Sequence, residues 1–245
     1  MLTKEISVVE LRLLNVFMLM KLYFKSGDFE RVIRFLSENT KANMYIKDLM
    51  EKLAKEANLA NRMIQNYVLY LYQILAHSYA QKNIFDKAKS TYFILCKIFN
   101  RWKVNNRAYE MADEESDLVV AEFGIDDYIR AKAGYAEAIM NLGEVDHAIE
   151  KLENAKQSIE NEIVYENPML FINICHQLGT CYLQESRRKS LDRALDNYEL
   201  ALVMINEAEQ ENKRQTRPQI SRYIEPISPM VVAKICLNIA LIRSQ

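Results

Sequence analysis

The sequence predicts an all-α protein, built as a stack of antiparallel helix hairpins. Three observations predict this fold class. The 245 residues contain only 5 Gly and 4 Pro, and such low usage disfavours loop-rich all-β or disordered chains. Half of the residues are hydrophobic, which is ample for a core at this length. Apolar side chains also recur at helical spacing along most of the chain, and no stretch has a convincing strand pattern.

The first hairpin is predicted by two apolar patterns that meet at a glycine. They cover residues 4–26 and 29–39. Gly27 suits the left-handed C-cap of the first helix, and Asp28 can cap the free N–H groups of the second. Further helices are predicted over 43–58, 60–82, 85–100, 103–124, 168–185, 191–212 and 230–243. Two more are predicted over 126–161 and meet at Leu142-Gly143-Glu144, which brings the total for the chain to about eleven.

Two stretches are predicted to differ from these helices. Residues 110–117 are an acidic run, expected on the solvated face of the helix over 103–124, which Asn105-Asn106 could interrupt. Residues 213–229 hold three of the four prolines. Because the residue before a proline is biased away from helix, this segment is predicted to be an extended connector.

A fixed spacing relates four of the helix pairs. A small or medium residue in the first helix is followed by another in the second, and large residues stand at fixed offsets around both. The pairs are Met20/Val32, Ala76/Ala88 and Ala136/Ala148, whose members are twelve positions apart, and Gly179/Ala194, whose members are fifteen apart. One position before the first member stands Leu19, Leu75, Tyr135 or Leu178, and three positions after it stands Tyr23, Tyr79, Ile139 or Tyr182. Four positions after the second member stands Leu36, Tyr92, Leu152 or Tyr198. Antiparallel helices approach closely when small residues meet at the crossing and large ones fill the space around it.

This pattern resembles the tetratricopeptide repeat (TPR) family. Two segments match its motif well, residues 72–92 and 135–155. A third segment, 19–36, is a degraded match, because Met20 and Val32 stand where small residues belong. The fourth, 178–201, matches if Glu185–Ser190 is an insertion in the turn. The second-helix markers are 56, 60 and 46 residues apart, whereas about 34 is usual, and the closing proline is absent. Either extra helices are intercalated or the helices are longer than usual.

The resemblance implies one TPR-like superhelical domain over 1–245. Its degenerate repeats would lie near 13–39, 69–100, 129–161 and 172–208, followed by the connector 213–229 and a terminal helix 230–243.

The resemblance further implies a groove, lined by the first helices of the hairpins, that binds a peptide or protein partner. The predicted groove residues are Gln73, His77, Gln81, Arg130, Glu137, Asn141, Asn173, His176, Gln177, Thr180, Lys234 and Asn238. Gln73, His77, Ala133 and Glu137 stand where TPR domains that clamp a C-terminal carboxylate need other residues, so that subtype is disfavoured. The expected function is an adaptor or scaffold in an assembly. The alternative is a peptide-sensing regulator similar to the pheromone receptors of Gram-positive bacteria, although residues 1–60 contain no recognisable DNA-binding unit.

The terminal helix over 230–243 is apolar nearly all round, so it must be covered on both sides. Ile235, Ile239 and Ile242 are therefore predicted to form a partner interface, in a homo-oligomer or a larger complex. The alternatives are that this helix folds back into the stack or belongs to a longer repeat array.

Other classes of function find little support. The net charge of −1 offers no field for nucleic acid, and the basic segment Lys213-Arg214, Arg217 and Arg222 has one aromatic neighbour, Tyr223. No catalytic or phosphate-binding motif is present, so neither an enzyme nor a cofactor is expected.

The four cysteines, Cys96, Cys175, Cys181 and Cys236, lack metal-ligand spacing and suit buried thiols in a reducing cytoplasm. No signal peptide or membrane span is expected.

Overall fold

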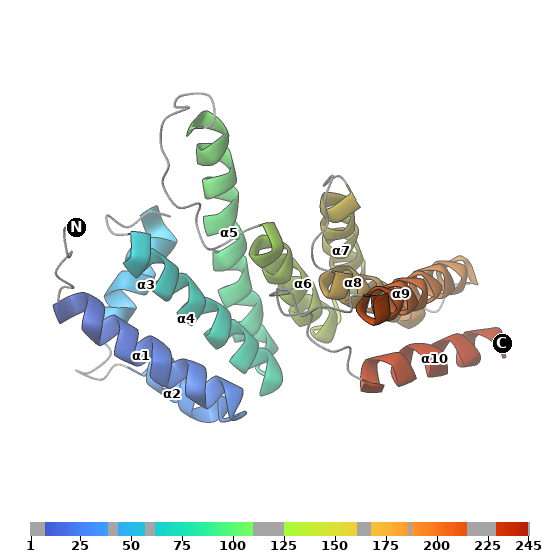
Figure 1. Cartoon of the computed structure of the whole chain (residues 1–245), viewed down its shortest axis with the longest axis horizontal. Coiled ribbons are helices and arrows are strands. Elements are labelled where there is room, and N and C mark those ends of the chain that lie inside the picture. The colour runs from blue at the N-terminus through green and yellow to red at the C-terminus, as the bar shows by residue number, and fades with distance from the viewer. Residues whose placement is uncertain are drawn as a thin grey trace. The chain divides into compact units, whose positions relative to one another are not determined.

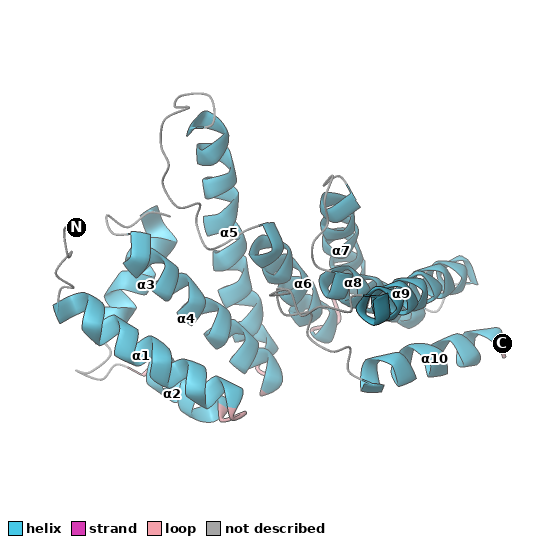
Figure 2. Ribbon diagram, in the orientation of Figure 1, coloured by secondary structure: helices cyan, strands magenta, loops and turns pink. Residues whose placement is uncertain are grey.

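The computed structural model describes residues 8–38, 44–56, 62–109, 125–160, 168–185, 188–214 and 229–244. These ranges form ten helices and contain no strand (Figures 1 and 2). The helices are α1 (Val8–Lys25), α2 (Phe29–Ser37), α3 (Met44–Glu56), α4 (Arg62–Gln81), α5 (Phe85–Tyr109), α6 (Ile125–Asn141), α7 (Val145–Glu160), α8 (Pro168–Glu185), α9 (Arg188–Arg214) and α10 (Pro229–Arg243). The predicted all-α class is confirmed for the part of the chain that is described.

The helix count differs from the prediction at α5. The sequence predicted an end near residue 100 and a new helix over 103–124, whereas α5 continues through Asn105-Asn106 to Tyr109. Asparagine lowers helix propensity only moderately, and neither Gly nor Pro occurs within α5 to stop it. The acidic run 110–117 and most of the predicted connector 213–229, including Arg217 and Arg222, lie outside the described residues.

The chain divides into two compact units, Met1–Ala138 and Ile139–Gln245, with the boundary inside α6. In the first unit α4 is the central helix, because it packs against α1, α2, α3 and α5. In the second unit α8 packs against both α7 and α9, and α9 also packs against α10. No described helix has both the length and the apolar character that crossing a membrane requires.

One type of turn recurs in three helix connections: α1–α2, α4–α5 and α6–α7. Each contains a residue with positive φ, namely Gly27 (76°), Asn83 (58°) and Gly143 (86°). In each turn the amide of the following residue donates to a carbonyl in the last turn of the preceding helix. These bonds are Asp28 N to Tyr23 O (2.9 Å), Ile84 N to Tyr79 O (2.9 Å) and Glu144 N to Ile139 O (3.0 Å). This is the Schellman arrangement, which satisfies carbonyls that the helix end would leave unpaired.

The predicted caps of the first hairpin are confirmed. Gly27 adopts the left-handed conformation expected at a C-cap. Asp28 is the N-cap of α2, and its side chain accepts a hydrogen bond from the amide of Arg31 at 3.2 Å.

The residues predicted to lie at the helix crossings are all buried. They are Met20, Val32, Ala76, Ala88, Ala136, Ala148, Gly179 and Ala194. The large residues at fixed offsets are buried or half-buried as well, with one exception. Leu19 is 39% exposed, because α1 has no described neighbour on that side.

Two tyrosine rings lie directly on glycines of neighbouring helices. A Cβ built on Gly134 of α6 would lie 2.4 Å from Cζ of Tyr92, on α5. A Cβ on Gly179 of α8 would lie 2.6 Å from Cε1 of Tyr198, on α9. Both distances are far below van der Waals contact, so each ring occupies the space that any other residue would fill with its side chain.

The α8–α9 hairpin departs from the other three in length. The sequence placed an insertion, Glu185–Ser190, in its turn, but α8 continues to Glu185 and α9 already begins at Arg188. Most of the additional residues are therefore helical. The Ser190 hydroxyl donates to Oε2 of Glu185 at 2.6 Å, which links the two helices close to their connection.

Candidate functional site

A polar row lies along one face of α4 in the first unit. It consists of Gln73, His77 and Gln81, which are spaced four residues apart and thus share a helix face. Nε2 of Gln73 donates to Oδ1 of Asp127, on α6, at 3.3 Å. Nε2 of Gln81 lies 3.2 Å from Nε2 of His77. His77 and Gln81 are exposed and Gln73 is half-buried, so the row is accessible along its length.

The electrostatics of His77 keep this row uncharged. The rings of Phe24 and Phe29 lie edge-on to the imidazole, with centroids at 5.2 and 6.4 Å. The surrounding side chains remove part of the imidazole from water although the residue keeps an exposed surface, and this desolvation lowers the pKa of His77 below its usual value. The neutral imidazole can accept a hydrogen bond from the Gln81 amide when its proton is on Nδ1. The row therefore presents neutral donors and acceptors, which suit hydrogen bonding to a peptide backbone.

The predicted site residues of α6 lie in different environments. Arg130 and Asn141 are exposed, whereas Glu137 is half-buried. Burial raises the pKa of the Glu137 carboxyl. Its charge in turn raises the pKa of Tyr92, after the larger effect of burial on that phenol. Glu137 is thus close to the ring that packs on Gly134.

The second unit brings four of the predicted site residues together around Tyr198. Nδ2 of Asn238, on α10, donates to the Tyr198 hydroxyl at 2.8 Å, and Oγ1 of Thr180, on α8, lies 3.1 Å from the same hydroxyl. The His176 ring centroid is 6.0 Å from that of Tyr198. Burial lowers the pKa of His176, and the nearby positive charge of Lys234 lowers it further. Asn173 and Gln177 are half-buried on the same helix, α8.

This arrangement assigns different roles to residues that the sequence grouped together. Thr180 links α8 to α9 through the Tyr198 hydroxyl, and Asn238 attaches α10 to the same hydroxyl. Asn173, His176 and Lys234 keep surface that a ligand can contact. The sequence predicts only a packing role for Tyr198, because its position in the repeat pattern gives no sign that its hydroxyl is a hydrogen-bonding centre.

The terminal helix α10 differs from its prediction. Ile235, Ile239 and Ile242 are buried within the chain, where α10 packs against α9. They are therefore not the surface that a partner would contact. The opposite face of α10 is the exposed one, with Leu237 at 60% exposure together with Met230, Cys236 and Leu241.

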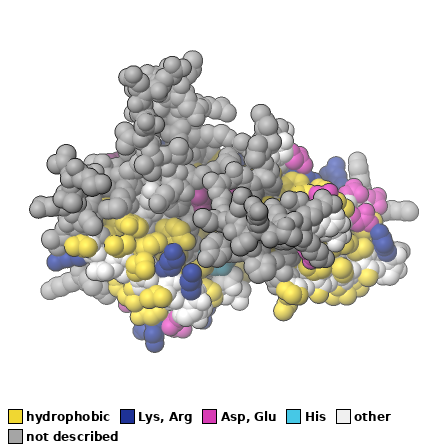
Figure 3. Space-filling model, in the orientation of Figure 1, with side chains coloured by type: hydrophobic (Ala, Val, Ile, Leu, Met, Phe, Trp, Pro, Cys, Tyr) yellow, Lys and Arg dark blue, Asp and Glu magenta, His cyan; other side chains and the backbone are white. Residues whose placement is uncertain are grey.

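An apolar face on α1 was not predicted as a binding surface. Leu11, Met18, Leu19 and Leu22 are all exposed, and Figure 3 shows hydrophobic side chains gathered over this part of the first unit beside Lys and Arg side chains. The only signal in the sequence is that the apolar residues of this helix exceed one face. That signal does not say which face the core uses.

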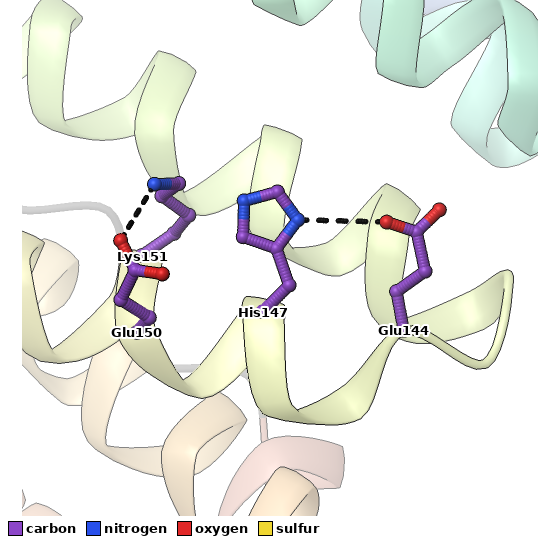
Figure 4. Close-up of polar contacts among 4 residues, drawn as sticks. All are labelled: Glu144, His147, Glu150 and Lys151. Atoms are coloured by element: carbon purple, nitrogen blue, oxygen red, sulfur yellow. Dashed lines mark hydrogen bonds and ion pairs between the residues drawn. The ribbon is translucent and has the colours of Figure 1, made fainter.

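The charged cluster at the start of α7 is a solvated surface (Figure 4). Nδ1 of His147 lies 3.5 Å from Oε2 of Glu144, and Nζ of Lys151 donates to Oε1 of Glu150 at 2.8 Å. The hydrogen bond and the charge of Lys151 lower the pKa of Glu150. No group of three or more potential metal ligands occurs among the described residues.

The buried cysteines behave as small hydrophobic residues. Cys175 and Cys181 are buried in α8, and burial raises the pKa of each thiol to about 12. Sγ of Cys181 lies 3.3 Å from Sδ of Met140. Protonated thiols in such surroundings are poor nucleophiles and poor metal ligands.

Comparison with known proteins gives a structural likeness only. No protein-family model matches the chain, and no curated protein matches it. Among solved structures, the crystal structure of BtubC (BKLC) from P. vanneervenii is similar, with a TM-score of 0.53 and 20% sequence identity. The match covers 92% of this chain and 69% of that chain. At this identity the likeness concerns the helical fold and carries no information about function.

Proposed function

We propose that this protein is a TPR-like helical-repeat scaffold that binds an extended segment of a partner protein. Three turns of one type, and the burial of the residues in all four predicted crossing pairs, support the TPR-like assignment, since similar local units are built from different residues. The free cysteines suit a reducing compartment such as the cytoplasm.

The observation that carries the proposal is the contrast between the faces of α4. Val68, Leu71, Leu75 and Tyr79 are buried in the hydrophobic core. Gln73, His77 and Gln81 form a neutral, accessible row along the same helix. Amide side chains donate and accept hydrogen bonds together, so such a row can pair with the backbone of an extended peptide. In the second unit, Asn173 and His176 on α8 offer similar groups.

The experiment is a selection of linear peptides from a display library on the immobilised protein. The selected peptides are then measured by fluorescence anisotropy against two row variants, Gln73→Ala/His77→Ala and Asn173→Ala/His176→Ala. We expect at least about a tenfold loss of affinity in one of them, which is about 1.4 kcal/mol. Glu150→Ala/Lys151→Ala removes exposed polar groups from α7 and is the matched control. Peptides that bind wild type and both row variants equally would exclude the proposed site.

A further inference from the structure

The outer face of α1, defined as Leu11, Met18, Leu19 and Leu22, is an exposed apolar feature that the proposed function does not use. Leu11 is 45%, Met18 50% and Leu22 63% exposed. The opposite face of the same helix carries Leu13 and Met20, which are buried in the core. α1 is therefore packed on one side, against α2 and α4, and exposes large side chains on the other.

The spacing of this outer face is that of a helix-packing ridge. Leu11, Met18 and Leu22 stand at positions i, i+7 and i+11, and Asn15 occupies i+4. Buried residues of α4 repeat this spacing inside the first unit: Val68, Tyr72, Leu75 and Tyr79. Rows of this kind pack into the grooves of a neighbouring helix. The residue types and the spacing thus favour a helix as the occupant.

The charges around the outer face decide which helix fits. Arg12 and Lys25 are exposed beside it. On the side toward α4, Nζ of Lys21 lies 5.5 Å from the Phe17 ring centroid and 5.9 Å from that of Tyr70. The charged residues of α1 are Glu10 in its first turn and the three basic residues Arg12, Lys21 and Lys25. Basic groups therefore border the apolar residues on both sides.

A second copy of the chain is a poor occupant for the same reason. Pairing α1 with α1 would bring Arg12 and Lys25 of both copies together, and like charges across an interface oppose association. Pairing α1 with the exposed face of α10 has a similar defect, because α10 carries Lys234 and Arg243 and no acidic residue of its own. Of the two, Arg243 is paired with Glu199 of α9 at 2.6 Å, so Lys234 is the charge that opposes this pairing. The partner must supply the opposite charge.

We propose that the outer face of α1 binds an amphipathic helix of another protein, one whose apolar stripe is bordered by Asp and Glu. Leucine-like side chains of that helix pack between Leu11, Met18 and Leu22, and its carboxylates pair with Arg12, Lys21 and Lys25. This is the helix-docking mode of peptide recognition. It goes beyond the proposed function, which concerns an extended segment on the polar rows.

Two synthetic helical peptides test the proposal. Both carry leucines at i, i+4, i+7 and i+11, one with glutamate and one with lysine at the bordering positions. The acidic peptide is expected to bind the full-length protein at least about tenfold more tightly than the basic one, with affinity that falls as salt rises. Equal binding of the two peptides would overturn the proposal, as would no binding of the acidic one.

Substitutions then locate the binding surface. Leu22→Glu and Met18→Glu are each expected to weaken binding of the acidic peptide at least about tenfold. Leu237→Glu is the matched control, because Leu237 on α10 is 60% exposed against 63% for Leu22 and should leave binding unchanged. Circular dichroism melts confirm that each variant is folded. Equal losses in the Leu22 and Leu237 variants would contradict the assignment to α1.

Two other occupants are distinguished by the same variants. Dimerisation in light scattering that Leu22→Glu abolishes would show that a second copy covers the face. Binding to phosphatidylserine vesicles that Leu22→Glu abolishes, without binding of the acidic peptide, would show a lipid surface. Either result overturns the proposal. The linear peptides selected on the polar rows are separate ligands, so failure of one proposal is distinguishable from failure of the other.

Discussion

At the residue scale, the two glycines beneath tyrosine rings show how closely the helices approach. Glycine costs about 1 kcal/mol relative to alanine inside a helix. Gly134 and Gly179 are both helical, and each gives its space to a ring, Tyr92 in one unit and Tyr198 in the other. The packing of a large aromatic side chain therefore outweighs the local preference for alanine.

Gly179→Ala is expected to lower the free energy of unfolding by about 1–2 kcal/mol. The added methyl would overlap the buried Tyr198 ring, and overpacking of this kind costs about 1–3 kcal/mol, which the gain in helix propensity offsets in part. Urea denaturation measures the change. In a Tyr198→Leu background the same substitution should be neutral or stabilising. A similar loss in both backgrounds would show that the ring is not the cause.

Glu137→Gln is expected to stabilise the protein at pH 7 and to have little effect near pH 4. The pKa of Glu137 is raised by burial. A group whose pKa is raised on folding contributes stability below its unfolded pKa, and that contribution is lost as pH rises through the folded pKa. Removing the charge thus helps only where the carboxyl is ionised. Chemical denaturation at both pH values checks this. Glu150→Gln on the α7 surface is the comparison and should not stabilise the protein at pH 7, because Lys151 lowers the pKa of that carboxyl. A gain of equal size at both pH values would contradict it.

Burial of single residues could be predicted from the sequence where the repeat spacing applied. The eight crossing residues are buried as expected, because a spacing that recurs in four helix pairs marks the positions at which the paired helices meet. The contact between Tyr92 and Gly134 could not be predicted, since it joins α5 to α6 across 110–124 and no spacing relates the two residues. The role of the Tyr198 hydroxyl was missed for the same reason: its partner Asn238 is 40 residues away.

At the scale of the element, the recurring turn determines where each helix ends. Its backbone bonds are alike in three hairpins although the left-handed residue is glycine in two of them and Asn83 in the third. Asparagine tolerates this conformation better than other residues with a side chain. The turns at Gly27 and Gly143 were predicted because glycine is a strong local signal, whereas Asn83 lies in the short break between the helices predicted over 60–82 and 85–100.

Gly143→Ala and Asn83→Ala are each expected to lower the free energy of unfolding by about 1–2 kcal/mol, since a Cβ is strained in the left-handed region. Asn83→Gly should be neutral or stabilising. Thermal or urea denaturation of the three variants tests this. Nothing lies within 4 Å of the Cβ position of Gly143, so a loss there reports backbone strain rather than a clash. Tolerance of alanine at both positions would show that the turns can relax.

The predicted partner interface at α10 is buried against the protein's own chain. A helix that is apolar all round must be covered, but its sequence does not tell which face meets its own chain. In the structure Ile235, Ile239 and Ile242 face inward, and Asn238, bonded to Tyr198, helps to fix that orientation. α1 shows the same ambiguity, because both its buried and its exposed faces are apolar.

At the scale of the whole molecule, two histidines give the stability a common dependence on pH. The pKa of His77 in the first unit and that of His176 in the second are both lowered, chiefly by burial. A group whose pKa is depressed on folding contributes stability above its unfolded pKa of 6.5. That contribution is lost as pH falls through the folded pKa.

The melting temperature is therefore expected to fall as pH is lowered from 7.5 through 6.5 toward 5. The double variant His77→Gln/His176→Gln should show a flatter acid limb than wild type, measured by calorimetry in matched buffers. His147→Gln, which changes the half-buried histidine on α7, is the control. If the double variant keeps the wild-type slope, other groups dominate the acid response.

The long α8–α9 hairpin shows where residues can be added to a hairpin without disturbing its buried crossing. Met20 and Val32 are separated by twelve positions, whereas Gly179 and Ala194 are separated by fifteen, yet all four residues are buried. The extra residues lengthen the two helices beyond the crossing instead of looping out, so both helix faces keep their register. Insertions beyond a crossing are thus compatible with a conserved core, and homologues are expected to differ in hairpin length at these ends sooner than at the crossings.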